Sequence, residues 1–187
     1  MKDRNRMGMM LFLASESVFF LILILAFIYY RSLWNQNSGP NPANQLNLLT
    51  TGLFSIALLS SSGAILFAEK RLATKNYREF TLGLLLTVIL GGIFLIGQGI
   101  EYAHLFQDKI TISQNLFGTT FFTLTGFHGL HVFVGLIMIS ILSVLSLRQE
   151  QHPVSASSVQ AISLYWHFVD AVWVVIFSVV YLWTVLA

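Results

Sequence analysis

The chain has 187 residues, of which 56% are hydrophobic and only 10% are charged, and its mean hydropathy is +0.74. This composition is typical of an integral membrane protein and leaves no room for a separate soluble domain. The formal charge of +2 comes from lysines and arginines in the loops, so we expect membrane lipids and no nucleic acid as partners.

Five apolar segments are each long enough to cross the ~30 Å hydrocarbon core, which requires ~20 residues at 1.5 Å per residue. We expect membrane-spanning helices over residues 7–30, 46–68, 80–100, 116–147 and 160–186. The predicted fold is therefore all-α, a single membrane domain over residues 1–187 built as a bundle of five transmembrane helices. No small-residue cleavage site follows the basic N-terminus, so we interpret the first span as retained and not as a signal peptide.

The positive charges of the loops predict the orientation of the bundle. On one side of the predicted membrane lie eight basic residues, namely Lys2, Arg4, Arg6, Lys70, Arg71, Lys75, Arg78 and Arg148. Only Arg31 and Lys109 lie on the other side. Because the side richer in lysine and arginine stays in the cytoplasm, we expect the N-terminus inside the cell and the C-terminus outside.

The first span contains an acidic residue, Glu16. Ionisable side chains are rare inside hydrocarbon and usually face other protein groups or a functional cavity. We therefore expect the Glu16 carboxyl to be buried against protein, to make a hydrogen bond and to be neutral.

The second and third spans contain small residues that predict close helix contacts. Ser61 and Ala64 belong to a patch with small-xxx-small spacing in the second span, and Gly91, Gly92, Gly97 and Gly99 occur in the third. Small residues allow two backbones to approach closely in a membrane. We interpret them as packing surfaces.

At the outer end of the third span, Glu101 and His104 form a Glu-x-x-His element. Di-iron bundles use this element twice, together with two further glutamates. Since this chain has it once, we favour an interfacial Glu101 and His104 that form hydrogen bonds with Gln98 one turn away, and we expect no metal-binding residues.

The fourth span places two imidazoles, His128 and His131, near the middle of the membrane. Residues three apart lie on the same side of a helix, so both rings should point the same way. We expect each ring to bind a neighbouring protein group and not a metal, with Glu101, Thr125 and Glu16 as candidates.

The last span carries Trp166, His167, Asp170 and Trp173 on adjoining turns. An indole N–H is a good donor to a buried carboxylate, and an imidazolium paired with Asp170 would cost less in lipid than either charge alone. Three interpretations of Asp170 are open: a bond to an indole, a pair with His167, or a role in handling protons.

The chain contains no cysteine. Thiolate-ligated iron–sulfur clusters, dinuclear copper centres and disulfides are therefore excluded for this chain alone. A haem held by two histidines would need them to face each other from two helices. His128 and His131 lie on one helix and His167 lies nearer the cytoplasmic face of another, so the spacing disfavours haem.

Four motifs in order resemble a known family. They are GMMLFLASESVFF (8–20), QGIEY (98–102) followed by GTTFF (118–122), TGFHGLHV (125–132) and YWHFVDAVW (165–173). Together they resemble subunit III of the haem–copper oxidases, the cytochrome c and quinol oxidases, in its five-helix bacterial form. The first motif is similar to the helix that carries the family's membrane-embedded glutamate, which corresponds here to Glu16.

The resemblance implies a non-redox accessory subunit of a proton-pumping terminal oxidase, located in the bacterial inner (plasma) membrane. It implies no catalytic residue and no cofactor in this chain, because haem and copper belong to the partner subunits I and II. It also implies bound phospholipid, support of proton uptake and oxygen access, and assembly with a small subunit IV or a larger respiratory supercomplex.

Two alternatives are open at this stage. One is a related accessory subunit of a nitric oxide reductase. The other is an independent transporter that uses Glu16 and Asp170 as proton carriers. Transporters usually show internal repeats or broken helices, and five spans without evident duplication argue against this alternative.

Overall fold

The computed structural model describes residues 2–34, 46–112, 116–147 and 154–183, most of which lie in long helices. Within these residues there are five α-helices, one π-helical segment and no strand, which confirms the predicted all-α class. Their bounds are α1 (Lys2–Trp34), α2 (Leu48–Ala73), α3 (Tyr77–Gln107), α4 (Leu116–Ser146), α5 (Ala156–Phe177) and η2 (Ser178–Leu182). Each α-helix, with η2 extending α5, is long and apolar enough to span a membrane.

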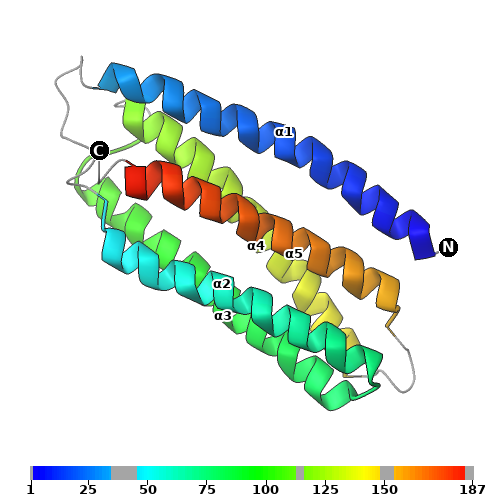
Figure 1. Ribbon diagram of the computed structural model, residues 1–187. Coiled ribbons are helices and arrows are strands. Elements are labelled where there is room, and N and C mark those ends of the chain that lie inside the picture. Colours follow the sequence, from blue (N-terminus) through cyan, green and yellow to red (C-terminus); the bar gives the residue numbers. More distant parts are fainter. Residues whose placement is uncertain (1, 35–45, 113–115, 148–153, 184–187) are drawn as a thin grey trace.

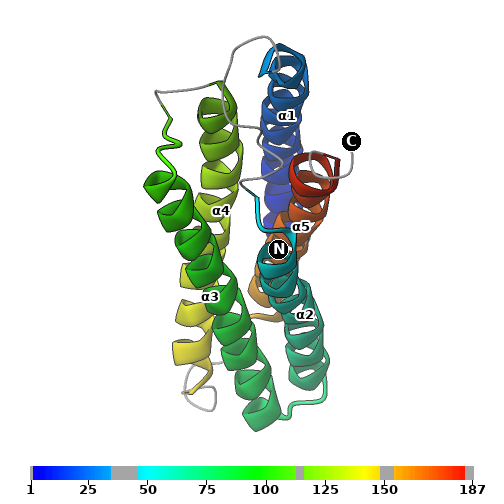
Figure 2. The ribbon, with the colours of Figure 1, turned by 90° about the vertical axis from the view of Figure 1, so that its left-hand side faces the viewer.

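The helices run in alternating directions along a common axis (Figure 1). Helices α2 and α3 form a tightly packed hairpin on one side of the bundle and α1 lies on the other, as Figures 1 and 2 both show. Helix α5 lies between them and contacts α1, α2 and α4. Side chains of α5 can therefore bind groups from most of the bundle.

The alternation places the start of α1, the α2–α3 turn and the start of α5 at the same end, which we call the N-side end (Figure 1). Lys70, Arg71 and Arg78 lie at this end, and Arg31 lies at the other. Arg148, one of the eight residues in the charge count, lies outside the described residues. Which end faces the cytoplasm stays a prediction.

Local sequence explains where the α2–α3 hairpin turns. Asn47 and Asn76 cap α2 and α3, and each side-chain oxygen accepts a backbone N–H of the first turn. Lys75 takes a left-handed conformation between the helices, with φ of 57°. Next to the turn, Gly83 lies against Ala68, since a Cβ there would come within 2.9 Å of the alanine Cβ.

Only half of the predicted glycine contacts are present. A Cβ at Gly91 would lie 2.8 Å from both Leu136 and the Trp166 ring, and one at Gly97 would overlap the Phe54 ring. Gly92 and Gly99 have open space instead. All four lie on one helix, but successive residues point about 100° apart. Gly91 and Gly97 therefore face neighbouring helices, while Gly92 and Gly99 do not.

Candidate functional site

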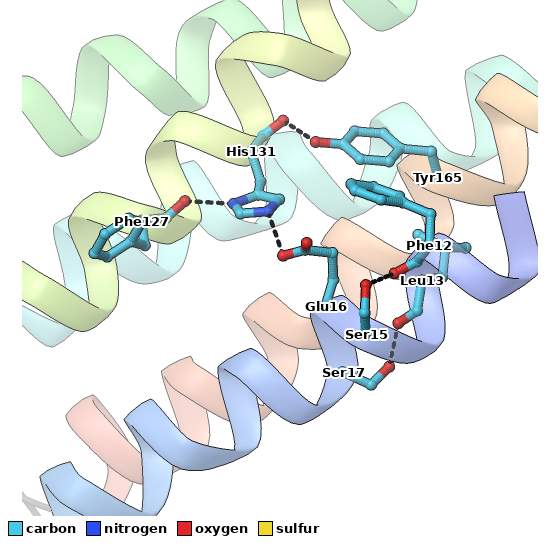
Figure 3. Close-up of polar contacts among 8 residues, drawn as sticks. All are labelled: Phe12, Leu13, Ser15, Glu16, Ser17, Phe127, His131 and Tyr165. Atoms are coloured by element: carbon cyan, nitrogen blue, oxygen red, sulfur yellow. Dashed lines mark hydrogen bonds and ion pairs between the residues drawn. The ribbon is translucent and has the colours of Figure 1, made fainter.

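Glu16 and His131 form a pair that joins α1 to α4 (Figure 3). Glu16 Oε2 lies 3.1 Å from His131 Nε2. His131 Nδ1 lies 2.7 Å from the Phe127 carbonyl oxygen, and the Tyr165 hydroxyl donates to the His131 carbonyl at 2.9 Å. The predicted hydrogen bond of Glu16 is thus confirmed, and its partner is one of the His131 contacts expected from the sequence.

The geometry of His131 limits where protons lie. A carbonyl oxygen can only accept a hydrogen bond, so Nδ1 must carry a hydrogen toward Phe127. One proton then remains between His131 Nε2 and Glu16 Oε2. On Oε2 it makes a neutral pair, and on Nε2 it makes an ion pair. The site can hold one exchangeable proton in two arrangements.

This pair lies at the edge of the bundle. The side chains of His131 and Glu16 retain 14% and 20% of their exposure, so Glu16 is less buried than predicted. An adjoining cavity of about 250 Å³ lies between α1, α4 and α5 and is lined by Met9, Phe12, Leu130, His131, Val134, Met138 and Tyr165. Because its lining is almost wholly apolar, this edge cavity suits an apolar occupant.

Glu101 forms a second cluster, inside the bundle. Thr51 donates to its Oε1 at 3.1 Å, and Tyr181 and Gln98 donate to its Oε2 at 2.7 and 3.4 Å. The bond to Gln98 confirms the prediction for Glu101. Tyr181 belongs to η2, where the wider π turn shifts the helix register and the tyrosine lies on the buried face. The carboxyl thus joins α2, α3 and η2 in one network.

Glu101 and His104 do not converge on a common site. Glu101 is buried and bonded to the three side chains above, whereas His104 is exposed. Among the residues that the structure describes, no three His, Asp or Glu side chains come close enough to hold a metal ion.

A third cluster links α2 to α5. The Ser62 hydroxyl donates to Asp170 Oδ2 and lies 2.9 Å from His167 Nδ1. Ser163 Oγ lies 3.4 Å from His167 Nε2. His167 and Asp170 are therefore joined through a serine, so a direct pair, one of the three interpretations of Asp170, is wrong.

The two tryptophans bind serines of α2 and not Asp170, so the interpretation of Asp170 as the acceptor of an indole N–H is also wrong. Trp166 donates to Ser61 at 2.8 Å, and Trp173 donates to Ser55 at 2.9 Å. Asp170 lies between the two tryptophans along α5, but both indole N–H groups donate to serine hydroxyls of α2 instead. Ser61, which the sequence indicated as a small packing residue, thus also acts as a hydrogen-bond acceptor.

His128 is the residue that departs most from expectation. Its side chain is fully buried, and within the described part of the chain neither ring nitrogen has a hydrogen-bond partner. The ring stacks on Trp173 at 4.9 Å and meets the edges of Phe94 and Phe20. The expected polar partner is thus wrong, because aromatic rings from three helices surround His128 whereas His131, one turn on, reaches α1.

Sequence reasoning missed several partners in these clusters: Thr51, Ser55, Ser62, Ser163, Tyr165 and Tyr181. Hydroxyl residues in an apolar helix usually bond to their own backbone. Nothing in the local pattern distinguishes these six. Five of them bind groups on other helices, and Ser163 contacts His167 one turn along its own helix.

Comparison with known proteins identifies the family. Residues 1–185 match the family described as cytochrome c oxidase subunit III. The chain belongs to this family. It is 40% identical to cytochrome c oxidase subunit 3 of Synechocystis sp., over 96% of this chain and 76% of the relative. The human subunit 3 is 36% identical over 95% and 69%, and a probable subunit 3 of Nocardia farcinica is 34% identical over 93% and 85%.

Membership in this haem–copper oxidase family makes the chain a multi-pass membrane subunit of an oxidoreductase complex. It implies other oxidase subunits as partners. It favours the oxidase interpretation over the nitric oxide reductase and the transporter.

Proposed function

We propose that this chain is a non-redox accessory subunit of a proton-pumping terminal oxidase in a bacterial plasma membrane, packed against the haem- and copper-bearing subunits I and II. The assembled complex reduces oxygen to water, and the names of the relatives favour cytochrome c over quinol as its electron donor. The observation that carries the proposal is the family match over residues 1–185.

The edge cavity supports a lipid role. It opens between α1, α4 and α5, and its lining includes Phe12, Val134 and Met138. A phospholipid acyl chain is apolar and flexible enough to fill such a space, and dissolved oxygen is also more soluble among apolar groups. We infer that this cavity holds a lipid tail and contributes to an apolar route for oxygen toward the catalytic subunit.

The bonding of the ionisable groups supports a stabilising role. Glu101 accepts bonds from three side chains, and Glu16 binds His131. These contacts fix the helices to one another. A rigid subunit of this kind would protect the proton-uptake mouth and the active-site metals of its partner during turnover.

The test compares the oxidase with and without this subunit. We expect haem and copper content, optical spectra and the initial rate of oxygen reduction to be nearly unchanged without it. Activity should then decay faster over many turnovers, with the larger loss at neutral to alkaline pH, where proton capture limits the rate. Metal analysis of the complex checks that copper accompanies haem. Loss of haem at the outset, or an unchanged inactivation rate, would contradict the accessory role.

A further inference from the structure

Asp170 is a buried carboxyl with one oxygen unused. The residue is 4% exposed, and Oδ2 accepts from Ser62. Its second oxygen, Oδ1, is buried with no hydrogen-bond partner in the described residues. An unpaired carboxylate oxygen in a low-dielectric interior is costly unless the group takes up a proton. Asp170 is thus placed to hold a proton.

A chain of polar side chains leads from Asp170 to the N-side end of the bundle. Ser62 Oγ lies 2.9 Å from His167 Nδ1, and His167 Nε2 lies 3.4 Å from Ser163 Oγ. Ser163 in turn interacts with the Glu69 carboxyl on α2. These groups follow one another at intervals of about one helical turn, because residues 163, 167 and 170 share a face of α5.

The row of polar side chains that starts at Asp170 ends at a cavity. Glu69 lines a space of about 120 Å³ between the last turn of α2 and the first turn of α5, together with Leu72, Ala73, Ala156, Val159 and Gln160. Such a space has room for water. The cavity connects the polar chain to the end of the bundle, where solvent is available.

The hydrogen bonds that link Asp170, Ser62 and His167 can take two opposite directions. With Asp170 as a carboxylate, Ser62 donates to it, and His167 Nδ1 must then donate to Ser62 because the hydroxyl has one hydrogen. With Asp170 protonated, its O–H donates to Ser62, Ser62 donates to His167 Nδ1, and Nε2 carries the imidazole hydrogen. Both arrangements satisfy the Ser62 hydroxyl and the His167 ring, and they differ by one proton on Asp170.

We propose that Asp170 is a proton-loading site that exchanges a single proton with the N-side end of the bundle through Ser62, His167 and Ser163. A proton from Glu69 or water in the cavity reaches His167 Nε2 through the Ser163 hydroxyl. His167 passes its Nδ1 hydrogen to Ser62, which passes its own hydrogen to Asp170 Oδ2. Unloading reverses these transfers, so histidine and serine regain their starting hydrogens. This inference rests on side-chain contacts within the chain and not on the proposed role in the oxidase.

The other ionisable side chains near α5 make different contacts and do not offer a second path for a proton to Asp170. On α1 and α4, Glu16 and His131 bind each other. His128 of α4 stacks on Trp173. On α2, Glu69 lies at the cavity, and its neighbour Lys70 is exposed.

Infrared spectroscopy can test the proposal on the full chain in lipid nanodiscs. The chain has three aspartates, so carboxyl-¹³C aspartate gives a sparse label. We expect a protonated aspartate C=O band that Asp170→Asn removes and that shifts rapidly when H₂O is replaced by D₂O. Ser62→Ala should keep the band but slow its exchange at least about tenfold, because the relay loses its central hydroxyl.

Two control variants test whether exchange depends on the path through Ser62, His167 and Ser163. Ser60→Ala removes an exposed hydroxyl from the same helix and should leave exchange unchanged, and Ser62→Thr restores a hydroxyl and should restore fast exchange. His167→Gln provides a second interruption, since an amide forms hydrogen bonds without relaying a proton. Helix content by circular dichroism confirms folding of each variant. Exchange as fast as in the parent in both Ser62→Ala and His167→Gln, or an aspartate band absent from the parent chain, would overturn the proposal.

Discussion

Glu101 and Glu16 differ in burial and in the number of their hydrogen-bond donors. Glu101 is 9% exposed and accepts hydrogen bonds from Thr51, Gln98 and Tyr181, which lie on three helical segments. Glu16 keeps more of its exposure, and among the described residues its side-chain hydrogen bond is to His131, beside the edge cavity. A carboxyl with three fixed donors has little freedom, whereas a carboxyl that shares one proton with an imidazole can change state. The interior network holds the fold, and the edge pair can respond to its surroundings.

The largest effect should follow from removing the interior carboxyl. Glu101→Ala leaves the Thr51, Gln98 and Tyr181 donors buried without an acceptor, so we expect a loss of about 3 kcal/mol or more in stability. Glu101→Gln keeps an acceptor oxygen and should lose much less. Thermal unfolding of the two variants by circular dichroism in the same detergent measures the difference. Equal destabilisation would mean that the bond count does not explain the role of Glu101.

A smaller effect should follow from a larger side chain at Gly91, where α3 packs against α4 and α5. Gly91→Leu forces a side chain into Leu136 and the Trp166 ring, and overpacking of this kind costs about 1–3 kcal/mol. Gly92→Leu is the matched control, because open space surrounds a Cβ at that position. We expect normal assembly with the oxidase for the control and reduced assembly for Gly91→Leu, measured by co-purification. Similar yields for both would show that α3 and α4 can separate without penalty.

The sequence was sufficient for the architecture because membrane spans depend on length and hydropathy, which can be read along one segment. It also identified Glu16, Glu101 and Asp170 as important, since charges inside hydrocarbon stand out by residue type alone. The sequence did not predict which side chains these buried polar residues contact. The indole of Trp166 binds Ser61, and the His128 ring contacts aromatic side chains without a hydrogen-bond partner among the described residues. Both outcomes depend on how helices far apart in the sequence rotate about their axes. The resemblance to subunit III specified the family but not these contacts.

The smallest effect should follow at the edge pair, where proton placement matters more than stability. Glu16→Gln keeps an N–H that can donate to His131 Nε2, so we expect assembly close to the parent. Glu16→Ala removes the hydrogen bond between Glu16 and His131 and should cost about 1 kcal/mol, in line with single hydrogen bonds between membrane helices. Quantitative co-purification compares them, and an equal loss in both would contradict a neutral donor at Glu16.

A hydrophobic carbodiimide separates the two proton arrangements, since it reacts with a protonated carboxyl. We expect it to modify Glu16, because sharing a proton with a neutral imidazole avoids an ion pair in low dielectric. It should spare Glu101, whose oxygens are occupied by three donors and shielded by the bundle. Mass spectrometry of the labelled chain locates the adduct. Modification of Glu101 in preference to Glu16 would reverse the contrast between a fixed interior carboxyl and a responsive one at the edge.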